Sequence, residues 1–121
     1  MAKGYLLTEE SQTWVPFEGE SLQDLQTAVK GFIELFPVDM SATLYGNEEG
    51  KLNSMVPTAF WLAPNGQDIQ DVFVGPLVLL GPGDDEGRDT DATPEMLEEL
   101  LKYHIAVIPL EMREQVRSDI F

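Results

Sequence analysis

The residues most able to do chemistry in this sequence are carboxylates gathered in one short run. Its acids are Asp84, Asp85, Glu86, Asp89, Asp91, Glu95, Glu98 and Glu99, with Arg88 among them. Carboxylate oxygens suit calcium, but the EF-hand template fails because its fifth position would be Arg88 and its sixth Asp89 instead of glycine. Three interpretations stay open: a flexible acidic loop, which we favour, a weak cation site of another type, and a surface that imitates a run of phosphates.

A second acidic pair lies in the segment Asn47-Glu48-Glu49-Gly50-Lys51. Together with Asp71 these carboxylates could hold a divalent cation, or they could grip a basic partner. Adjacent strand residues point to opposite faces, so Glu48 and Glu49 are poorly placed as a general acid and base pair. We favour a tight turn, because Asn47 and Gly50 both tolerate positive φ and Lys51 neutralises part of the charge.

Motifs for catalysis are missing from the sequence. His104 is the single histidine and there is no cysteine, so a zinc site and a Cys-His nucleophile lack their usual groups. A Ser-His-Asp triad stays formally open, but no Gly-x-Ser-x-Gly elbow supports it, and no Gly-Lys-Ser/Thr phosphate loop is present. Trp14, Phe60 and Trp61 could stack on a small nucleotide, although we favour a place in the core or an interface. We predict that the protein is not an enzyme and needs no metal and no cofactor.

The charge balance narrows the class of partner. Twenty-two Asp and Glu face seven Lys and Arg, for a net charge of −15. Such a surface repels phosphates and anionic membranes, so we expect no direct nucleic-acid or membrane binding. It would attract a basic groove on another protein, although solubility alone is the simpler interpretation. The apolar runs are far shorter than the ~20 residues that span a bilayer, and the N-terminus does not resemble a signal peptide, so we expect a cytoplasmic protein.

Hydrophobic periodicity predicts short strands mixed with helices. Strands are expected at residues 5–8, 13–17, 32–38, 43–45 and 71–80, and helices at 21–30, from 93 onward and at 110–121. Ser21 and Thr93 are the expected N-caps, Pro94 suits a first helical position, and Gly31 suits a left-handed C-terminal residue. Residues 57–62 could form a helical turn. Gly75-Pro76 predicts a bulge or bend within a single central strand over 71–80.

These elements predict an α+β fold with a small, largely antiparallel sheet and two or three helices packed on one face. The 121 residues contain no linker and no repeat. This indicates one domain over residues 1–121, large enough to bury a core. Residues 93–121 are interpreted as a helical C-terminal extension of that domain.

The order of these segments resembles a known family. The helix that leads into Gly31 and a Phe-Ile-Glu strand, the segment 47–52, and the strand that begins at Asp71 and reaches Gly75 have the order and spacing of the DUF3846 group. These are small proteins of unknown function, found mostly in phages, plasmids and other mobile elements. The resemblance covers about residues 22–87. It implies a phage-type or mobile-element accessory protein and no catalytic residue.

Charge and resemblance together suggest a leading hypothesis. We expect a non-enzymatic accessory protein that binds a host protein with a basic surface, such as a nucleic-acid-handling defence component, through an acidic face built from residues 84–99. The alternative is a protein that binds or sequesters a signalling nucleotide, which would need several basic groups around an apolar pocket. Short edge strands and the C-terminal helix also offer surfaces on which two copies could pair as a homodimer.

Overall fold

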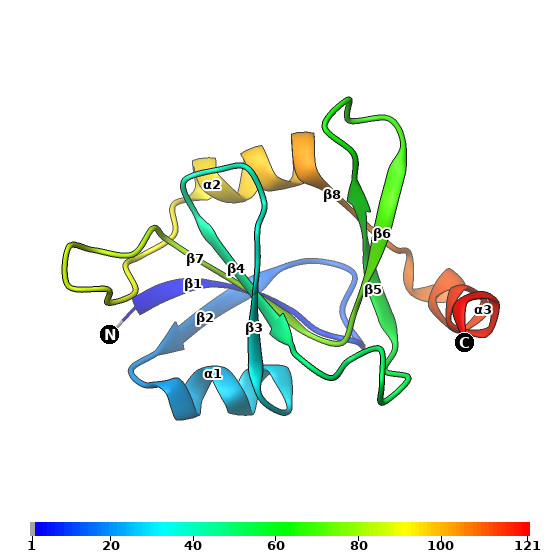
Figure 1. The fold of residues 1–121 in the computed structure, drawn as a ribbon, viewed down its shortest axis with the longest axis horizontal. Helices are drawn as coiled ribbons and strands as arrows, with labels where there is room; N and C mark the ends of the chain where they lie inside the picture. The colour runs from blue at the N-terminus through cyan, green and yellow to red at the C-terminus, as the bar shows by residue number, and fades with distance from the viewer. Residues whose placement is uncertain (1) are drawn as a thin grey trace.

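The structure is a computed structural model that describes residues 2–121. Within these residues the chain forms two antiparallel sheets and three α-helices (Figure 1), which confirms the predicted α+β class. The five-stranded sheet has the order β2-β1-β7-β4-β3, and the three-stranded sheet has the order β6-β5-β8. The strands are β1 (Ala2–Leu7), β2 (Val15–Gly19), β3 (Ile33–Phe36), β4 (Thr43–Asn47), β5 (Pro57–Leu62), β6 (Ile69–Val74), β7 (Leu77–Leu80) and β8 (Ile105–Val107). The helices are α1 (Leu22–Val29), α2 (Pro94–Glu99) and α3 (Leu110–Ile120), and a π-helical turn, η1 (Leu100–His104), follows α2.

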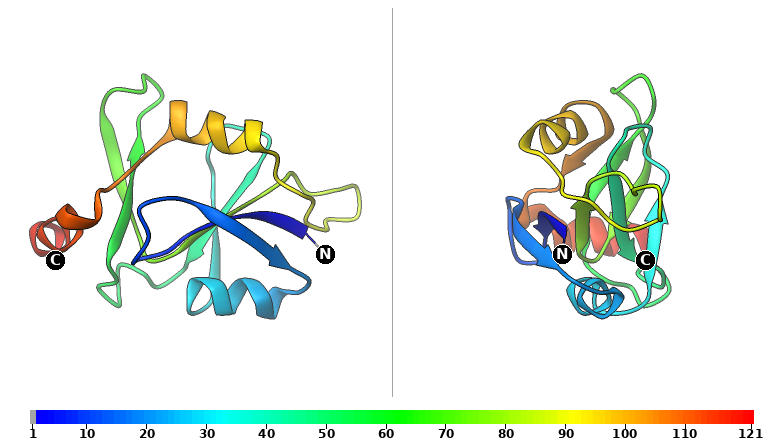
Figure 2. Two further views of the ribbon diagram at one scale, coloured as in Figure 1. Left: turned by 180° about the vertical axis from the view of Figure 1, so that it is seen from behind. Right: turned by 90° about the vertical axis from the view of Figure 1, so that its left-hand side faces the viewer.

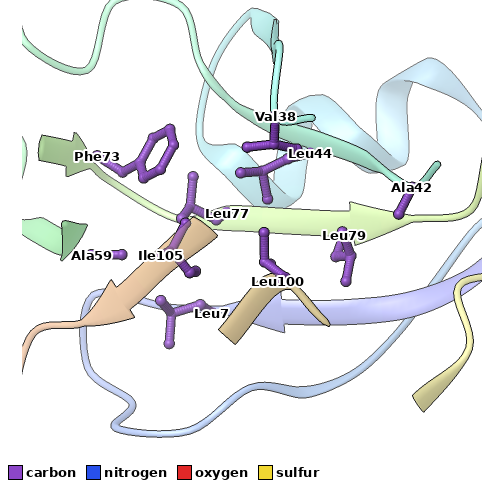
Figure 3. Packing of buried hydrophobic residues seen from close by; sticks show 10 residues of the cluster. All are labelled: Leu7, Val38, Ala42, Leu44, Ala59, Phe73, Leu77, Leu79, Leu100 and Ile105. Carbon is purple, nitrogen blue, oxygen red and sulfur yellow. The ribbon is translucent and has the colours of Figure 1, made fainter. Parts of the chain in front are cut away.

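Helices α1 and α2 lie on opposite faces of the five-stranded sheet instead of together on one face. Strand β7 shows why, because its side chains alternate between faces and all of them are buried. Val78 and Leu80 pack against α1, whereas Leu77 and Leu79 belong to the larger core cluster that Leu100 joins (Figure 3). Figure 2 shows α1 and α2 on opposite sides of this sheet in both views. A central strand that is apolar on both faces therefore needs a helix on each.

The predicted single strand over residues 71–80 is wrong, because the chain changes sheets within it. Strand β6 ends at Val74 in the three-stranded sheet, and β7 begins at Leu77 in the five-stranded sheet. Gly75 between them has φ +81, a conformation that residues with a side chain rarely adopt. Its N–H donates to the Val56 carbonyl at 2.7 Å, and its carbonyl accepts from the Thr58 hydroxyl at 2.8 Å. The bend anticipated at Gly75-Pro76 is thus the junction of two sheets.

Residues 57–62 form β5 and not a helical turn. This strand is central in its sheet and pairs with both β6 and β8. Pro57 has no N–H to donate, and it lies at the first position of the strand, where proline is tolerated. Thr58 and Ala59 are fully buried, so tertiary pairing prevails over the local signal for a turn.

Local capping signals place the ends of α1 and the start of α2. The hydroxyl of Ser21 accepts from Asp24 N–H, and the hydroxyl of Thr93 accepts from Met96 N–H, as predicted. At the other end of α1, Lys30 and not Gly31 takes the left-handed conformation, with φ 65. Gly31 is needed for another reason: a Cβ there would lie 2.7 Å from the amide nitrogen of Asn47.

The C-terminal segment predicted to be helical also contains a strand. After α2 the helix continues as the wider π-helical turn η1. At its end the N–H of Ile105 donates to the Leu100 carbonyl, five residues earlier. Strand β8 then pairs with β5 before α3 begins. In Figure 1, α3 lies beyond the three-stranded sheet. No helix within residues 2–121 combines the length and the apolar character needed to cross a bilayer.

Candidate functional site

The acidic loop between β7 and α2 is held by its own first aspartate. The carboxylate of Asp84 accepts from the N–H groups of Glu86 and Arg88, at 2.9 and 2.8 Å, and from Arg88 Nε at 3.0 Å. The N–H groups of Arg88 and Glu86, with the Arg88 guanidinium, hold the pKa of Asp84 below its usual value. Asp84 therefore organises the loop, and its oxygens already have partners.

Two further acids of the run attach this loop to the sheet. Asp89 accepts from the Tyr45 hydroxyl at 2.7 Å, and Asp91 accepts from the Lys3 N–H at 2.8 Å. Burial and the hydrogen bond to Asp89 raise the pKa of Tyr45. The N–H of Ala92 adds a bond of 2.8 Å to the Lys3 carbonyl. Asp84, Asp89 and Asp91 thus hold the loop in place, although Asp89 and Asp91 are also exposed.

The carboxylates of the other five acids accept none of these hydrogen bonds that hold the loop, and we call these five residues the acidic ridge. Its members are Asp85, Glu86, Glu95, Glu98 and Glu99, and all five are exposed. Two lie on the loop and three on α2, whose Met96 and Leu97 pack against the core. Exposed carboxylates also occur on β2, on the 48–49 turn and on α3. The ridge is therefore the densest stretch of a surface that is negative on several sides.

Most of the basic side chains are already neutralised within the protein. Within residues 2–121 the ion pairs of lysine and arginine are Lys3–Glu18, Lys30–Glu9, Lys51–Asp71, Arg88–Asp84, Arg88–Glu86 and Arg117–Glu114. Arg113 is buried against backbone carbonyls, and Lys102 lies over the ring of Tyr103. The surplus of carboxylates is consequently the charge that a partner would meet.

The segment 47–51 is a turn built around a buried asparagine. Asn47 is 5% exposed; its amide nitrogen donates to the Val29 carbonyl at 2.9 Å, and its amide oxygen accepts from the Glu49 N–H at 2.8 Å. Gly50 packs so closely on β6 that a Cβ there would lie 2.9 Å from the Val74 carbonyl oxygen. These two residues join α1, β4 and β6, whereas the side chains of Glu48 and Glu49 stay exposed.

Lys51 links this turn to β6 by forming an ion pair with Asp71, the carboxylate that a divalent-cation site with Glu48 and Glu49 would have needed. Its Nζ lies 2.5 Å from the Asp71 carboxylate. Burial raises the pKa of Asp71, but the hydrogen bonds from Lys51 and the Val72 N–H, with the Lys51 charge, outweigh it and hold that pKa below its usual value. Within residues 2–121 no three carboxylate or histidine side chains come together as a metal-binding group.

A cavity of about 430 Å³ opens beside this ion pair, between the two sheets. Phe36 of β3, Trp61 of β5 and Phe73 of β6 form its aromatic wall. The ring centroids of Trp61 and Phe73 are 5.0 Å apart and stacked, and Phe36 meets Phe73 edge-on at 4.8 Å. Glu34, Glu48, Lys51 and Asp71 also line the cavity. We call this space the intersheet cavity.

Sequence reasoning singled out Trp61 but missed its two aromatic neighbours. Glu34 and Phe36 alternate on β3, and Asp71 and Phe73 alternate on β6, so each strand directs one acid and one ring to the same face. That alternation was the only sequence signal that could have indicated Phe36 and Phe73 as parts of a site. It could not reveal that β3 and β6, which belong to different sheets, face each other.

A smaller cavity of about 200 Å³ shares Pro37 and Trp61 with the first. Tyr103 and His104 of η1 line its other side, and Nε2 of His104 lies 3.9 Å from a Glu99 carboxylate oxygen. The wide backbone of the π-turn brings these two side chains to Trp61, and such turns are frequent at functional sites. Trp61 therefore separates two adjoining recesses.

The fold and these surfaces define a small acidic α+β protein with two antiparallel sheets and an aromatic cavity between them. The family described as a domain of unknown function (DUF3846) matches residues 3–105, and the chain belongs to it. The matched region ends at the first residue of β8, so α3 lies outside it. No curated protein and no solved structure matches the chain.

Proposed function

We propose that this protein is a non-enzymatic binding protein whose acidic surface docks on a basic surface of a partner protein. The observation that carries the proposal is the acidic ridge. It presents five exposed carboxylates on one loop and one helix. Arg88 pairs with one of them, Glu86, and with Asp84, and no ion pair found within residues 2–121 joins the other four to a lysine or an arginine. Charges arranged in this way steer association and help to select a partner.

The setting that we propose follows from the family and the sign of the charge. The protein acts as an accessory protein of a phage or mobile element in the host cytoplasm. Its partner is a host protein with a basic groove, such as a nucleic-acid-handling defence component. The ridge occupies this groove as a row of negative charges in place of the phosphates of a nucleic acid. Direct contact with nucleic acid is not part of this proposal, because phosphates would meet a net charge of −15.

The second candidate, a protein that sequesters a signalling nucleotide, finds less support. A phosphate-bearing ligand would need basic groups converging on an aromatic pocket. Among the larger cavities of residues 2–121, those with a basic side chain contain one each: Arg88, Lys102, Lys51 or Lys30. The basic group beside the aromatic wall, Lys51, is already bound to Asp71. The geometry therefore favours a basic partner over an anionic ligand.

The proposal is tested by affinity capture from host extract at low salt, with the captured protein identified and its binding measured after purification. The informative variant replaces Asp85, Glu95 and Glu98 by their amides. This removes three charges from the ridge and leaves the loop-holding acids in place. At about 0.5 kcal/mol for each exposed charge, affinity should fall about tenfold. Binding should also weaken steeply as salt rises.

A matched control variant replaces Glu10, Glu111 and Asp119, which are all exposed. Glu111 and Asp119 lie on α3, and Glu10 lies in the β1–β2 connection that Arg113 of α3 contacts. The control variant removes the same charge and should bind nearly as well as the wild type at physiological salt. Equal losses in the two variants would show that net charge matters and the ridge does not. Recovery of nothing specific at low salt would overturn the proposed function itself.

A further inference from the structure

We propose that the intersheet cavity binds the side chain of an arginine presented by the partner. This inference rests on the proposed function, since it specifies how a basic partner would be recognised. Negative charge is spread over several elements and attracts basic proteins in general. Selection of one partner also needs a recess whose shape fits one kind of side chain, and the intersheet cavity is such a recess with charged residues at its rim.

The wall of the cavity suits a flat cation. Trp61 and Phe36 are only partly buried, and their rings border the open space above the buried Phe73. The ring of Phe36 lies across Gly46 of β4, where a Cβ would approach it to 2.4 Å. The missing side chain therefore leaves room for the Phe36 ring that lines the cavity. A guanidinium over such rings gains from both cation–π attraction and planar stacking.

The rim of the cavity supplies the opposite charge. Glu34, Glu48 and Asp71 contribute three carboxylates and Lys51 contributes one positive charge, which leaves an excess of two negative charges. Glu34 and Glu48 are exposed, and none of the hydrogen bonds or ion pairs found within residues 2–121 involves their carboxylates. An arginine with its aliphatic stem along the rings can offer its forked N–H groups to such oxygens. A phosphate or a carboxylate would be repelled from the same rim.

Lys51 acts as an internal competitor in this arrangement. Its ammonium already lies on Asp71, at 2.5 Å. Its position shows that the rim holds a cation, and replacing it with methionine would free Asp71 and make the rim more negative by one charge. The same substitution that weakens a site for anions should therefore strengthen a site for arginine. The direction of the change in affinity caused by Lys51→Met therefore distinguishes an anionic ligand from an arginine.

The experiment titrates N-acetylargininamide into the full chain and follows the backbone and indole N–H signals by NMR. Its matched control ligand is N-acetylcitrullinamide, which has the same shape and no charge. A Trp61→Phe variant assigns the indole signal, and Trp14, which does not line the cavity, provides an internal reference. We expect a saturable shift at Trp61 and at the 46–51 segment with the arginine ligand, and a response at least about fivefold weaker with citrulline.

Variants then locate the binding site. Glu34→Gln with Glu48→Gln should weaken the arginine response about fivefold to tenfold, and Lys51→Met should strengthen it. Glu20→Gln with Glu111→Gln removes the same charge elsewhere and should leave the response unchanged. Equal responses to arginine and citrulline, or shifts confined to residues 84–99, would overturn this inference. Because the probe replaces the partner, the two proposals can fail separately. Absence of an arginine response would overturn this inference and leave the ridge proposal standing, whereas a response at Trp61 without a captured partner would support the arginine site and overturn only the ridge proposal.

Discussion

Replacement of Arg113 by methionine should destabilise the protein more than the same replacement of any other basic side chain. Arg113 is 2% exposed and donates to four backbone carbonyls: Ile108 at 2.8 Å, Thr8 at 2.9 Å, Glu9 at 2.9 Å and Ser11 at 2.7 Å. Burial lowers its pKa, and the charges of Glu10 and Glu9 oppose that shift. This one side chain joins α3, which lies outside the family match, to the β1–β2 connection.

The expected loss follows from the carbonyls that methionine leaves behind. A buried polar group without a partner costs about 1–3 kcal/mol. Ile108 is fully buried, whereas water can reach part of the 8–11 segment, so about two unsatisfied groups should remain. Part of this loss is offset, because methionine avoids the desolvation cost that the buried guanidinium imposes on the folded state. The net loss should be about 2–4 kcal/mol, a large share of the 5–15 kcal/mol that is typical of a domain.

Urea unfolding monitored by tryptophan fluorescence provides the assay, and circular dichroism gives a second probe of the same transition. The matched control is Arg117→Met, because Arg117 lies on the same helix and makes a hydrogen bond to one carbonyl, that of Ser54, at 2.8 Å. The control should lose no more than about 1 kcal/mol. If Arg113→Met stayed within about 0.5 kcal/mol of the wild type, the claim that this side chain attaches α3 would be refuted.

Two further predictions concern the turn and the acidic loop. Asn47→Ala removes the bonds to Val29 and Glu49 and should lower the free energy of unfolding by about 2 kcal/mol in the same urea assay. The pKa of Asp84 is depressed in the folded protein, so its contribution to loop order is fully present above the unfolded value of about 3.9 and is lost as pH falls through the folded value. NMR titration should show the Asp84 carboxyl protonating below a pH of about 3.9, together with changes at the Arg88 amide.

Each of these two predictions has its own control. Asn53→Ala changes an exposed asparagine of the same turn and should cost little; an equal loss at Asn47 and Asn53 would remove the special role of the buried amide. For the loop, Asp84→Asn should abolish the low-pH change at Arg88. Persistence of that change in the variant would assign it to another carboxyl group.

The structure divides the acids of residues 84–99 into two groups with different roles. Asp84, Asp89 and Asp91 hold the loop in place, so replacing them would test folding of the loop as well as binding. Asp85, Glu95 and Glu98 can be neutralised without that complication, because none of the hydrogen bonds or ion pairs found within residues 2–121 involves their carboxylates, whereas Glu86 pairs with Arg88 and Glu99 lies near His104. A net charge counted from the sequence cannot make this distinction, because it weighs a carboxylate that accepts backbone N–H groups the same as one that faces solvent.

The sequence by itself determined the features that depend on near neighbours. Ser21 caps α1 and Thr93 caps α2, because a capping side chain meets N–H groups only two or three residues away. The alternation and periodicity of apolar residues indicated an α+β domain, and the excess of acids determined the sign of the surface charge. These signals need no knowledge of the partner segment.

Only the tertiary structure decided which segments meet. The break at Gly75 divides residues 71–80 between two sheets, and β5 becomes a strand because β6 and β8 pair with it on either side. Arg113 is buried because carbonyls about a hundred residues earlier in the chain surround its guanidinium. The intersheet cavity likewise exists because strands of two different sheets face each other. Such contacts depend on the pairing and register of the whole chain, and local periodicity carries no information about them.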